Sequence, residues 1–78
     1  MIQYYKHAED QIKERKISKE EVEMTIKNPI AVVNGRSNRK IAHSVFGDKL
    51  LRVIYEKKND KIIVVSAYRA DPRRYFRR

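Results

Sequence analysis

The clearest pattern along the chain is a run of apolar segments between residues 40 and 69, broken by two short polar turns. Three segments, Ile41–Phe46, Leu50–Glu56 and Ile62–Tyr68, are rich in Val, Ile and Tyr. The turn residues Gly47-Asp48 and Lys57–Lys61 separate them, which is typical of consecutive β-hairpins. We therefore expect three antiparallel strands. The last is apolar on both faces, which predicts a position inside the sheet.

Two helices are expected before these strands. Apolar residues recur at helical spacing from His7 to Arg15. The second helix has a stronger start signal, because Ser18 followed by Glu21 forms a capping box. Pro29 disfavours helical geometry at the residue before it, so this helix should end near Asn28. Only Lys16-Ile17 separates the two helices, which favours a helical hairpin.

The remaining segments are less decisive. Ile30–Val33 is a short apolar run that could form a further strand, and Asn34–Asn38 has the composition of a turn. Ile2–Tyr5 fits a strand or a helix entry equally well. The predicted fold class is α+β: one domain over residues 1–78, with an N-terminal helical hairpin packed on an antiparallel meander of three or four strands. Residues 69–78 are expected to form a basic C-terminal tail.

Composition and hydropathy limit the cellular compartment that we expect for the protein. The chain of 78 residues has no cysteine, which excludes disulfides and thiolate metal sites. No apolar run reaches the length of a membrane span, and the N-terminus lacks the apolar core of a signal peptide. These observations predict a soluble, cytoplasmic protein without a membrane partner.

Charge is distributed unevenly and indicates a class of partner. Residues 1–27 have six Lys/Arg and six Asp/Glu, whereas residues 28–78 have thirteen Lys/Arg and four Asp/Glu. The whole net charge of +9 therefore belongs to the predicted sheet and tail. This asymmetry favours a polyanion, with nucleic acid as the leading choice. A surface that is merely solubilising is the alternative.

Strand register predicts which side chains lie together. A two-residue turn at Gly47-Asp48 places His43 opposite Arg52, in an otherwise apolar row. The second turn leaves two registers open. A two-residue turn, Asn59-Asp60, places Arg52 opposite Ala67. A three-residue turn places it opposite Ser66 and brings Tyr68 to the side of His43 and Arg52.

That combination of side chains suits RNA cleavage without a metal. The reaction needs a base for the ribose 2′-OH, an acid for the leaving 5′-oxygen and a cation on the phosphate. His43 could serve as base or acid, Arg52 could stabilise the transition state, and Tyr68 could donate a proton or stack on a base. His7 is a further candidate at the start of the first helix. Each of these residues alone also fits a structural role.

No other chemistry has a sequence signal. The chain has no metal-ligand spacing, no phosphate loop and no cofactor motif, so no metal or cofactor is expected. Basic residues flank the predicted sheet at both ends, and on one rim they would form a strip for RNA phosphates. The residues proposed for RNA contact are Arg36, Arg39, Lys40, Arg69, Arg73 and Arg74.

Several motifs in order resemble the RelE/BrnT-like toxin superfamily. The segment HAEDQIKERKISKEEVEMTIKNP (His7–Pro29) is similar to the histidine-led first helix, charged turn and second helix of its small members. The closing VVSAYRADPRRYFR (Val64–Arg77) is similar to the BrnT-like last strand and basic segment. Gly47, Leu50 and Arg52-Val53 meet a G-x-x-L-x-V pattern between them with approximate spacing.

The resemblance implies a RelE-like fold and a ribonuclease toxin, free or dependent on ribosome-bound mRNA, that a cognate acidic antitoxin neutralises. By position, Arg52, Tyr68 and Arg69 match the family's catalytic places best, followed by His43, and His7 matches its helix-start histidine. Gln11 departs from the basic residue found in many relatives. The family's last strand reads roughly I-S-A-R, and here Tyr68 stands between Ser66-Ala67 and Arg69, so the arginine is displaced by one position.

Two other functions fit the same residues. The basic face could bind nucleic acid without cleaving it, or an exposed sheet face or edge could dock a partner protein. The sequence also leaves homo-oligomerisation open.

Overall fold

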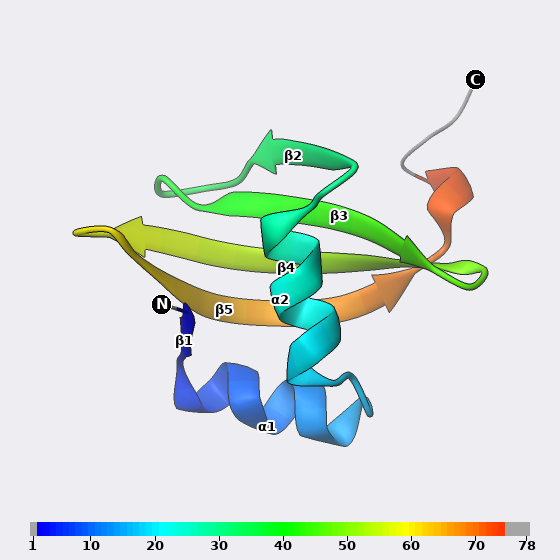
Figure 1. Ribbon diagram of the computed structural model, residues 1–78, viewed down its shortest axis with the longest axis horizontal. Helices are drawn as coiled ribbons and strands as arrows, with labels where there is room; N and C mark the ends of the chain where they lie inside the picture. Colours follow the sequence, from blue (N-terminus) through cyan, green and yellow to red (C-terminus); the bar gives the residue numbers. More distant parts are fainter. Residues whose placement is uncertain (1, 75–78) are drawn as a thin grey trace.

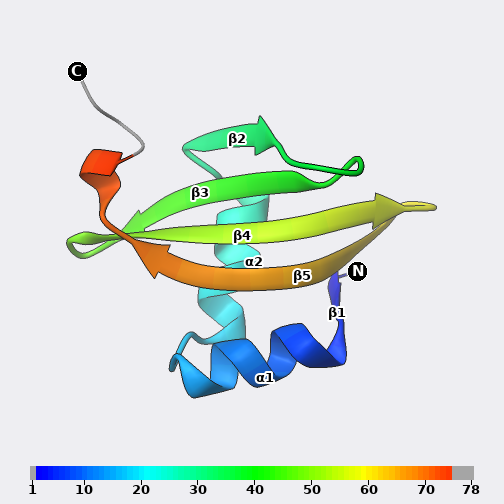
Figure 2. The same cartoon turned by 180° about the vertical axis from the view of Figure 1, so that it is seen from behind.

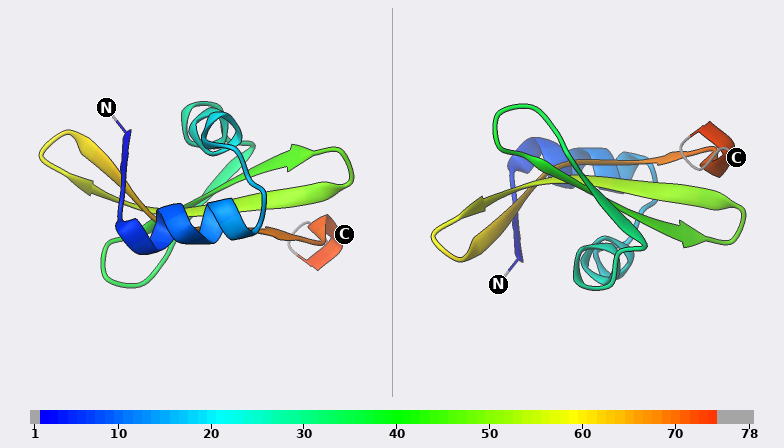
Figure 3. Two further views of the ribbon diagram at one scale, coloured as in Figure 1. Left: turned by 90° about the horizontal axis from the view of Figure 1, so that it is seen from below. Right: turned by 90° about the horizontal axis from the view of Figure 1, so that it is seen from above.

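A five-stranded sheet in the order β1-β5-β4-β3-β2 forms the centre of the computed structural model, which describes residues 2–74. Helix α2 crosses one face of the sheet, and α1 runs alongside β5 (Figures 1 and 3). The opposite face carries no helix across β3, β4 and β5 (Figure 2). The elements are β1 Ile2–Tyr4, α1 Lys6–Glu14, α2 Lys19–Lys27, β2 Ala31–Asn34, β3 Lys40–Phe46, β4 Lys49–Lys58, β5 Lys61–Ala70 and the short 3-10 helix η1 Pro72–Arg74.

The α+β class and the helical hairpin are confirmed, but the expected antiparallel sheet of three or four strands is wrong. Strand β1 adds a fifth strand and pairs parallel with β5, with Ile2 opposite Ile62 and Tyr4 opposite Val64. Three residues are too few to show a strand period, and their partner lies sixty residues away along the chain. The sequence therefore carried no local signal for this pairing. β5 is an inner strand, as its two apolar faces predict.

The first hairpin has the predicted two-residue turn. Gly47 occupies the left-handed region with φ 65°, and His43 lies opposite Arg52. In the second hairpin Asn59 and Asp60 form a two-residue turn, both with positive φ, as in a type I′ turn.

Beyond this second turn the register changes, and neither predicted pairing holds. Lys58 lies opposite Lys61 and Tyr55 opposite Val64, but a β-bulge between Ile54 and Tyr55 shifts the ladder by one residue. Arg52 therefore lies opposite Tyr68 instead of Ala67 or Ser66. A bulge inserts one unpaired residue and reverses the side assignment beyond it, which turn length alone does not reveal.

The hydrophobic core lies between the helices and one face of the sheet. Its buried members are Ala8, Ile12, Ile17, Val22, Leu51, Val53, Val64 and Ala67. Because side chains alternate along a strand, Arg52 between Leu51 and Val53 points to the helix-free face. The core thus fixes the direction in which the polar residues of β4 point.

The C-terminus of α1 and the N-terminus of α2, which meet at the loop of the helical hairpin, are both capped. The Ser18 hydroxyl accepts from Glu21 N–H at 3.0 Å, and the Glu21 carboxylate accepts from Ser18 N–H at 3.1 Å, as the sequence predicts. At the end of α1, the N–H of Ile17 donates to Ile12 O at 2.8 Å and that of Lys16 to Lys13 O at 3.2 Å. This is a Schellman motif with Lys16 at the left-handed position, φ 56°.

Replacing Lys16 by Gly should stabilise the fold by about 0.5–1 kcal/mol, because a residue with a Cβ is strained at this φ and glycine is not. Chemical denaturation of the two proteins measures the difference. Lys13→Gly is the matched control, since Lys13 is helical and glycine there should cost about 1 kcal/mol. Equal losses in both variants would contradict the capping assignment.

Candidate functional site

Three polar side chains meet at the centre of the helix-free sheet face, one from each of three neighbouring strands. His43 on β3 lies opposite Arg52 on β4, and Arg52 lies opposite Tyr68 on β5. Arg52 Nε donates to His43 Nε2 at 3.0 Å, and Arg52 Nη1 donates to the Tyr68 hydroxyl. The guanidinium carbon also lies 5.3 Å from the Tyr68 ring centroid. We call these three residues the Arg52 cluster.

The bonding of the cluster assigns the state of its histidine. His43 is 3% exposed, and burial, reinforced by the charge of Arg52, lowers the pKa of His43 below 6.5. The ring is therefore neutral near pH 7. Because its Nε2 accepts from Arg52, the proton of this neutral ring is on Nδ1. His43 orients the guanidinium, and Arg52 supplies the positive charge of the cluster.

A second polar line runs from β5 to α1. The Ser66 hydroxyl donates to Gln11 Oε1 at 2.6 Å, and Gln11 Nε2 donates to His7 Nε2 at 2.9 Å. Ser66 precedes Tyr68 by two residues and so shares its side of β5. His7 therefore belongs to this second line and makes no described contact with the Arg52 cluster.

Gln11 is the site residue whose role the sequence reasoning missed. His7 and Gln11 on α1 and Arg15, the C-cap residue of that helix, are spaced by four residues and lie along one stripe. Arg15 Nη1 donates to Ala67 O at 2.8 Å, which joins the same stripe to β5. This i,i+4 spacing of polar residues, next to the apolar stripe of Ala8 and Ile12, was the available signal.

The predicted basic residues do not share one rim. Lys40 begins β3 and Ala70 ends β5, and these strands run in the same direction, so the two groups lie at opposite ends of the sheet (Figure 1). At the β2–β3 turn, Arg36 is exposed. Arg39 pairs with Glu56 at 3.0 Å, and the Lys40 ammonium donates to Asn34 Oδ1 at 2.8 Å.

Arg69 points to the helix side of the sheet, away from the Arg52 cluster. It lies opposite Leu51, and its guanidinium donates to Arg15 O at 2.7 Å and Lys16 O at 3.0 Å. These carbonyls end α1, where a cation is favourable. The structure thus gives Arg69 a role in holding the helix end, in line with its displaced position in the sequence motif.

The other C-terminal arginines follow β5, which includes residues 69 and 70 of the predicted tail. Arg73 pairs with Asp71 at 3.0 Å and, by hydrogen bonding, lowers the pKa of that carboxyl to about 2. Arg74 is exposed at the end of η1. Residues 75–78 of the predicted basic tail lie outside the described residues.

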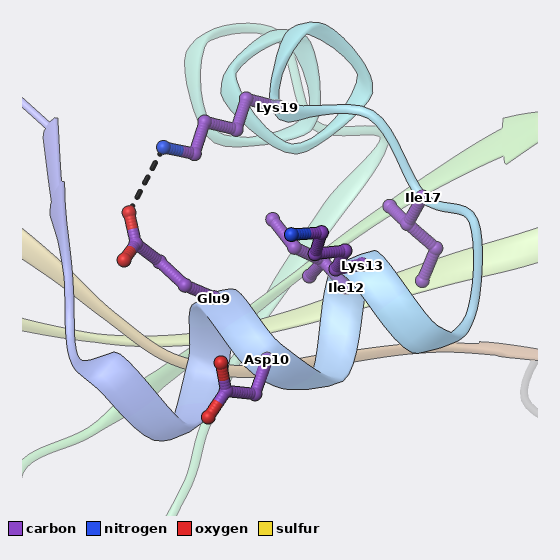
Figure 4. A pocket seen from close by; sticks show the side chains of 6 residues that line it. All are labelled: Glu9, Asp10, Ile12, Lys13, Ile17 and Lys19. Carbon is purple, nitrogen blue, oxygen red and sulfur yellow. Dashed lines mark hydrogen bonds and ion pairs between the residues drawn. The ribbon is translucent and has the colours of Figure 1, made fainter.

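A pocket lies at the helix junction, on another part of the molecule. Glu9, Asp10, Ile12, Lys13, Ile17 and Lys19 line it, and a 2.9 Å ion pair between Lys19 and Glu9 crosses it (Figure 4). Its two isoleucines belong to the core, so this pocket is a surface hollow over packed residues. Within residues 2–74, no group of three or more His, Asp or Glu is placed to hold a metal ion.

Because buried His43 is neutral, the free energy of unfolding depends on pH. Unfolded His43 titrates near pH 6.5, and the folded residue titrates lower. Its contribution to stability is therefore complete above pH 6.5 and lost as the pH falls below that value, because the unfolded chain binds the proton more readily. We expect the free energy of unfolding of wild type to fall between pH 7 and 5, and His43→Gln to show a flatter profile. Urea denaturation measures both slopes, and parallel slopes would contradict the neutral buried imidazole.

Comparisons with known proteins place the chain in a family. No curated protein and no solved structure matches it. No helix in the described part of the chain is long and apolar enough to cross a membrane. Residues 4–69 match the family described as "Domain of unknown function (DUF4258)", a span that includes both helices and strands β2 to β4. The chain therefore belongs to the DUF4258 family.

Proposed function

We propose that this protein is a toxin-type endoribonuclease that cleaves RNA without a metal, with a RelE-like fold as the sequence resemblance implies. The observation that carries the proposal is the Arg52 cluster. It places a guanidinium between a buried imidazole and a phenol on the helix-free sheet face, in the basic half of the chain. An anion-binding cation flanked by two proton-transfer groups is what phosphodiester cleavage by a 2′-OH requires.

In this proposal a phosphate of the RNA binds to Arg52. The phosphate oxygens compete for Arg52 Nε, and the exchange releases the lone pair on His43 Nε2. His43, neutral near pH 7, then accepts the proton of the ribose 2′-OH as this oxygen attacks phosphorus. The bond from phosphorus to the 5′-oxygen breaks, and Tyr68 donates a proton to that oxygen. The products are a 2′,3′-cyclic phosphate and a 5′-hydroxyl.

The strand spacing suits this division of roles. Neighbouring strands lie about 4.8 Å apart, so His43 and Tyr68 on either side of β4 approach a bound phosphate from opposite directions. The attacking and leaving oxygens of an in-line displacement also lie on opposite sides of phosphorus. Basic residues at the two ends of the sheet would hold the flanking nucleotides, with Arg36 at one end and Arg74 at the other.

The proposed function implies a protein partner. The resemblance implies a cognate acidic antitoxin, and the excess positive charge of the chain is complementary to it.

The alternative function uses the same sheet face, which would also serve a nucleic-acid-binding module without catalysis. RNA that is bound but left intact would favour this alternative.

A cleavage assay in EDTA separates the two functions. Fluorescent RNA is incubated with wild type and with His43→Ala, and binding is measured in parallel by anisotropy at 50 and 200 mM salt. We expect cleavage by wild type, little cleavage by the variant, and binding by both that weakens steeply with salt. Binding without cleavage in any sample would support the module. Binding that ignores salt would contradict both.

A further inference from the structure

Strand β2 leaves an apolar edge on the sheet. It is the last strand in the order β1-β5-β4-β3-β2, so no described strand pairs with its outer side. The described residues include six exposed large hydrophobic side chains, and four of them, Met24, Ile30, Val32 and Val33, belong to the segment from α2 to β2. Proteins normally protect such an edge with charge or proline, and residues 30–35 contain neither.

The backbone of β2 also offers hydrogen bonds at this edge. Gly35 N–H donates to Arg39 O at 2.7 Å, which identifies a hydrogen-bonded pair of the β2–β3 ladder. Such pairs alternate along antiparallel strands, so Ala31 and Val33 direct their amides and carbonyls toward β3. The N–H and C=O of Val32 and Asn34 therefore point to the outer edge. Val32 and Val33 place their side chains on opposite faces, where an added strand would meet both.

Charge around β2 selects the kind of partner. From Met24 to Gly47 the chain has no acidic residue, whereas Lys27 precedes β2 and Arg36, Arg39 and Lys40 follow it. Arg39 is paired with Glu56, and the other three cations are exposed. Pairing of β2 with β2 of a second copy would bring two such cationic surrounds together, each on a chain of net charge +9. An acidic segment is instead complementary to this edge.

We propose that the free edge of β2 binds an extended acidic segment of a partner protein, which joins the sheet as a sixth strand. The partner's alternate apolar side chains cover the valine on one face of this edge, either Val32 or Val33, and its carboxylates approach the cations at the two ends of β2. Main-chain hydrogen bonds to Val32 and Asn34 supply the pairing. The inference does not rest on the nuclease proposal, because it uses neither the Arg52 cluster nor RNA.

A designed peptide tests this edge directly. The probe is a ten-residue peptide of alternating Val and Glu with blocked ends, titrated into the full chain while backbone amide signals are followed by NMR. We expect the largest shifts at residues 31–34. A Val-Lys peptide and a Val-Glu peptide N-methylated at every second amide should each bind at least tenfold more weakly. The first lacks the charge match and the second lacks the hydrogen bonds.

Val32→Pro tests the same surface from the protein side. The Val32 N–H points outward, so proline removes an edge donor without breaking the β2–β3 ladder. It should lower peptide affinity at least tenfold, while Val32→Ala, which keeps the N–H, should lower it less. If the proline variant fails to fold, the affinity of the N-methylated peptide for the wild-type protein still tests whether main-chain hydrogen bonds hold the peptide.

Three results would overturn the proposal. They are equal binding of the N-methylated peptide, shifts centred on Arg52 instead of β2, and a dimer of the free protein that Val32→Pro dissociates. RNA cleavage is assayed separately on the same samples, so a failure of the edge and a failure of the nuclease are distinguished.

Discussion

Arg52→Ala should reduce the single-turnover rate of RNA cleavage by about 10³-fold or more. The substitution removes the charge that would stabilise the developing phosphorane, and an arginine that stabilises the transition state of phosphoryl transfer contributes about 10³–10⁵-fold. It also removes the phosphate-binding donor that lies 3.0 Å from His43 Nε2. Arg52→Lys should recover part of the binding but little of the rate, because an ammonium cannot reach His43 and Tyr68 together as the guanidinium fork does.

The control for this prediction is Lys57→Ala. Lys57 is exposed, lies on the same strand and also carries one positive charge, so its loss should change the rate less than threefold. The rate is measured with enzyme in excess over RNA, and circular dichroism confirms that each variant is folded. A similar loss for both variants would mean that general charge, and not the position of Arg52, governs the reaction.

Leu51→Ala should lower the free energy of unfolding by about 3 kcal/mol. Leu51 is 2% exposed and belongs to the core between the helices and the sheet, where a leucine truncation typically costs 2–5 kcal/mol. For a domain of this length that loss corresponds to a fall in the melting temperature of roughly ten degrees or more. Urea denaturation with a two-state fit measures it.

Val45→Ala is the matched control for Leu51. Val45 lies on β3 with 44% of its surface exposed, so its truncation should cost no more than about 0.5 kcal/mol. Comparable losses in the two variants would show that the core is not centred on the helix-covered face of the sheet. The direction of Arg52, which depends on Leu51 and Val53 pointing to the helices, would then be in question.

The parts of the fold that follow local rules could be predicted from the sequence. The Ser18–Glu21 capping box, the end of α2 before Pro29 and the turn at Gly47 each depend on residues within a few positions of one another. The pairing of His43 with Arg52 follows from that turn alone. These features therefore needed no knowledge of the rest of the chain.

The parts that could not be predicted depend on distant contacts. The parallel pairing of β1 with β5 joins residues far apart in the chain, and the bulge beside Tyr55 has no proline or glycine to announce it. That bulge places Tyr68 opposite Arg52. The sequence therefore predicted the pairing of Arg52 with His43 but not its pairing with Tyr68. The role of Gln11 likewise depends on where α1 packs against β5.

The most direct test of the proposal that the Arg52 cluster is a nuclease site is the chemistry of the RNA ends that are found after incubation with the protein. A short RNA of known sequence is incubated with wild type in EDTA, and the RNA is then analysed by mass spectrometry. Attack by the ribose 2′-OH predicts 2′,3′-cyclic phosphate and 5′-hydroxyl ends, and a 2′-deoxy substitution at the cut position should abolish that cut. Fragments with 5′-phosphate and 3′-hydroxyl ends, or RNA that stays intact while bound, would contradict the account.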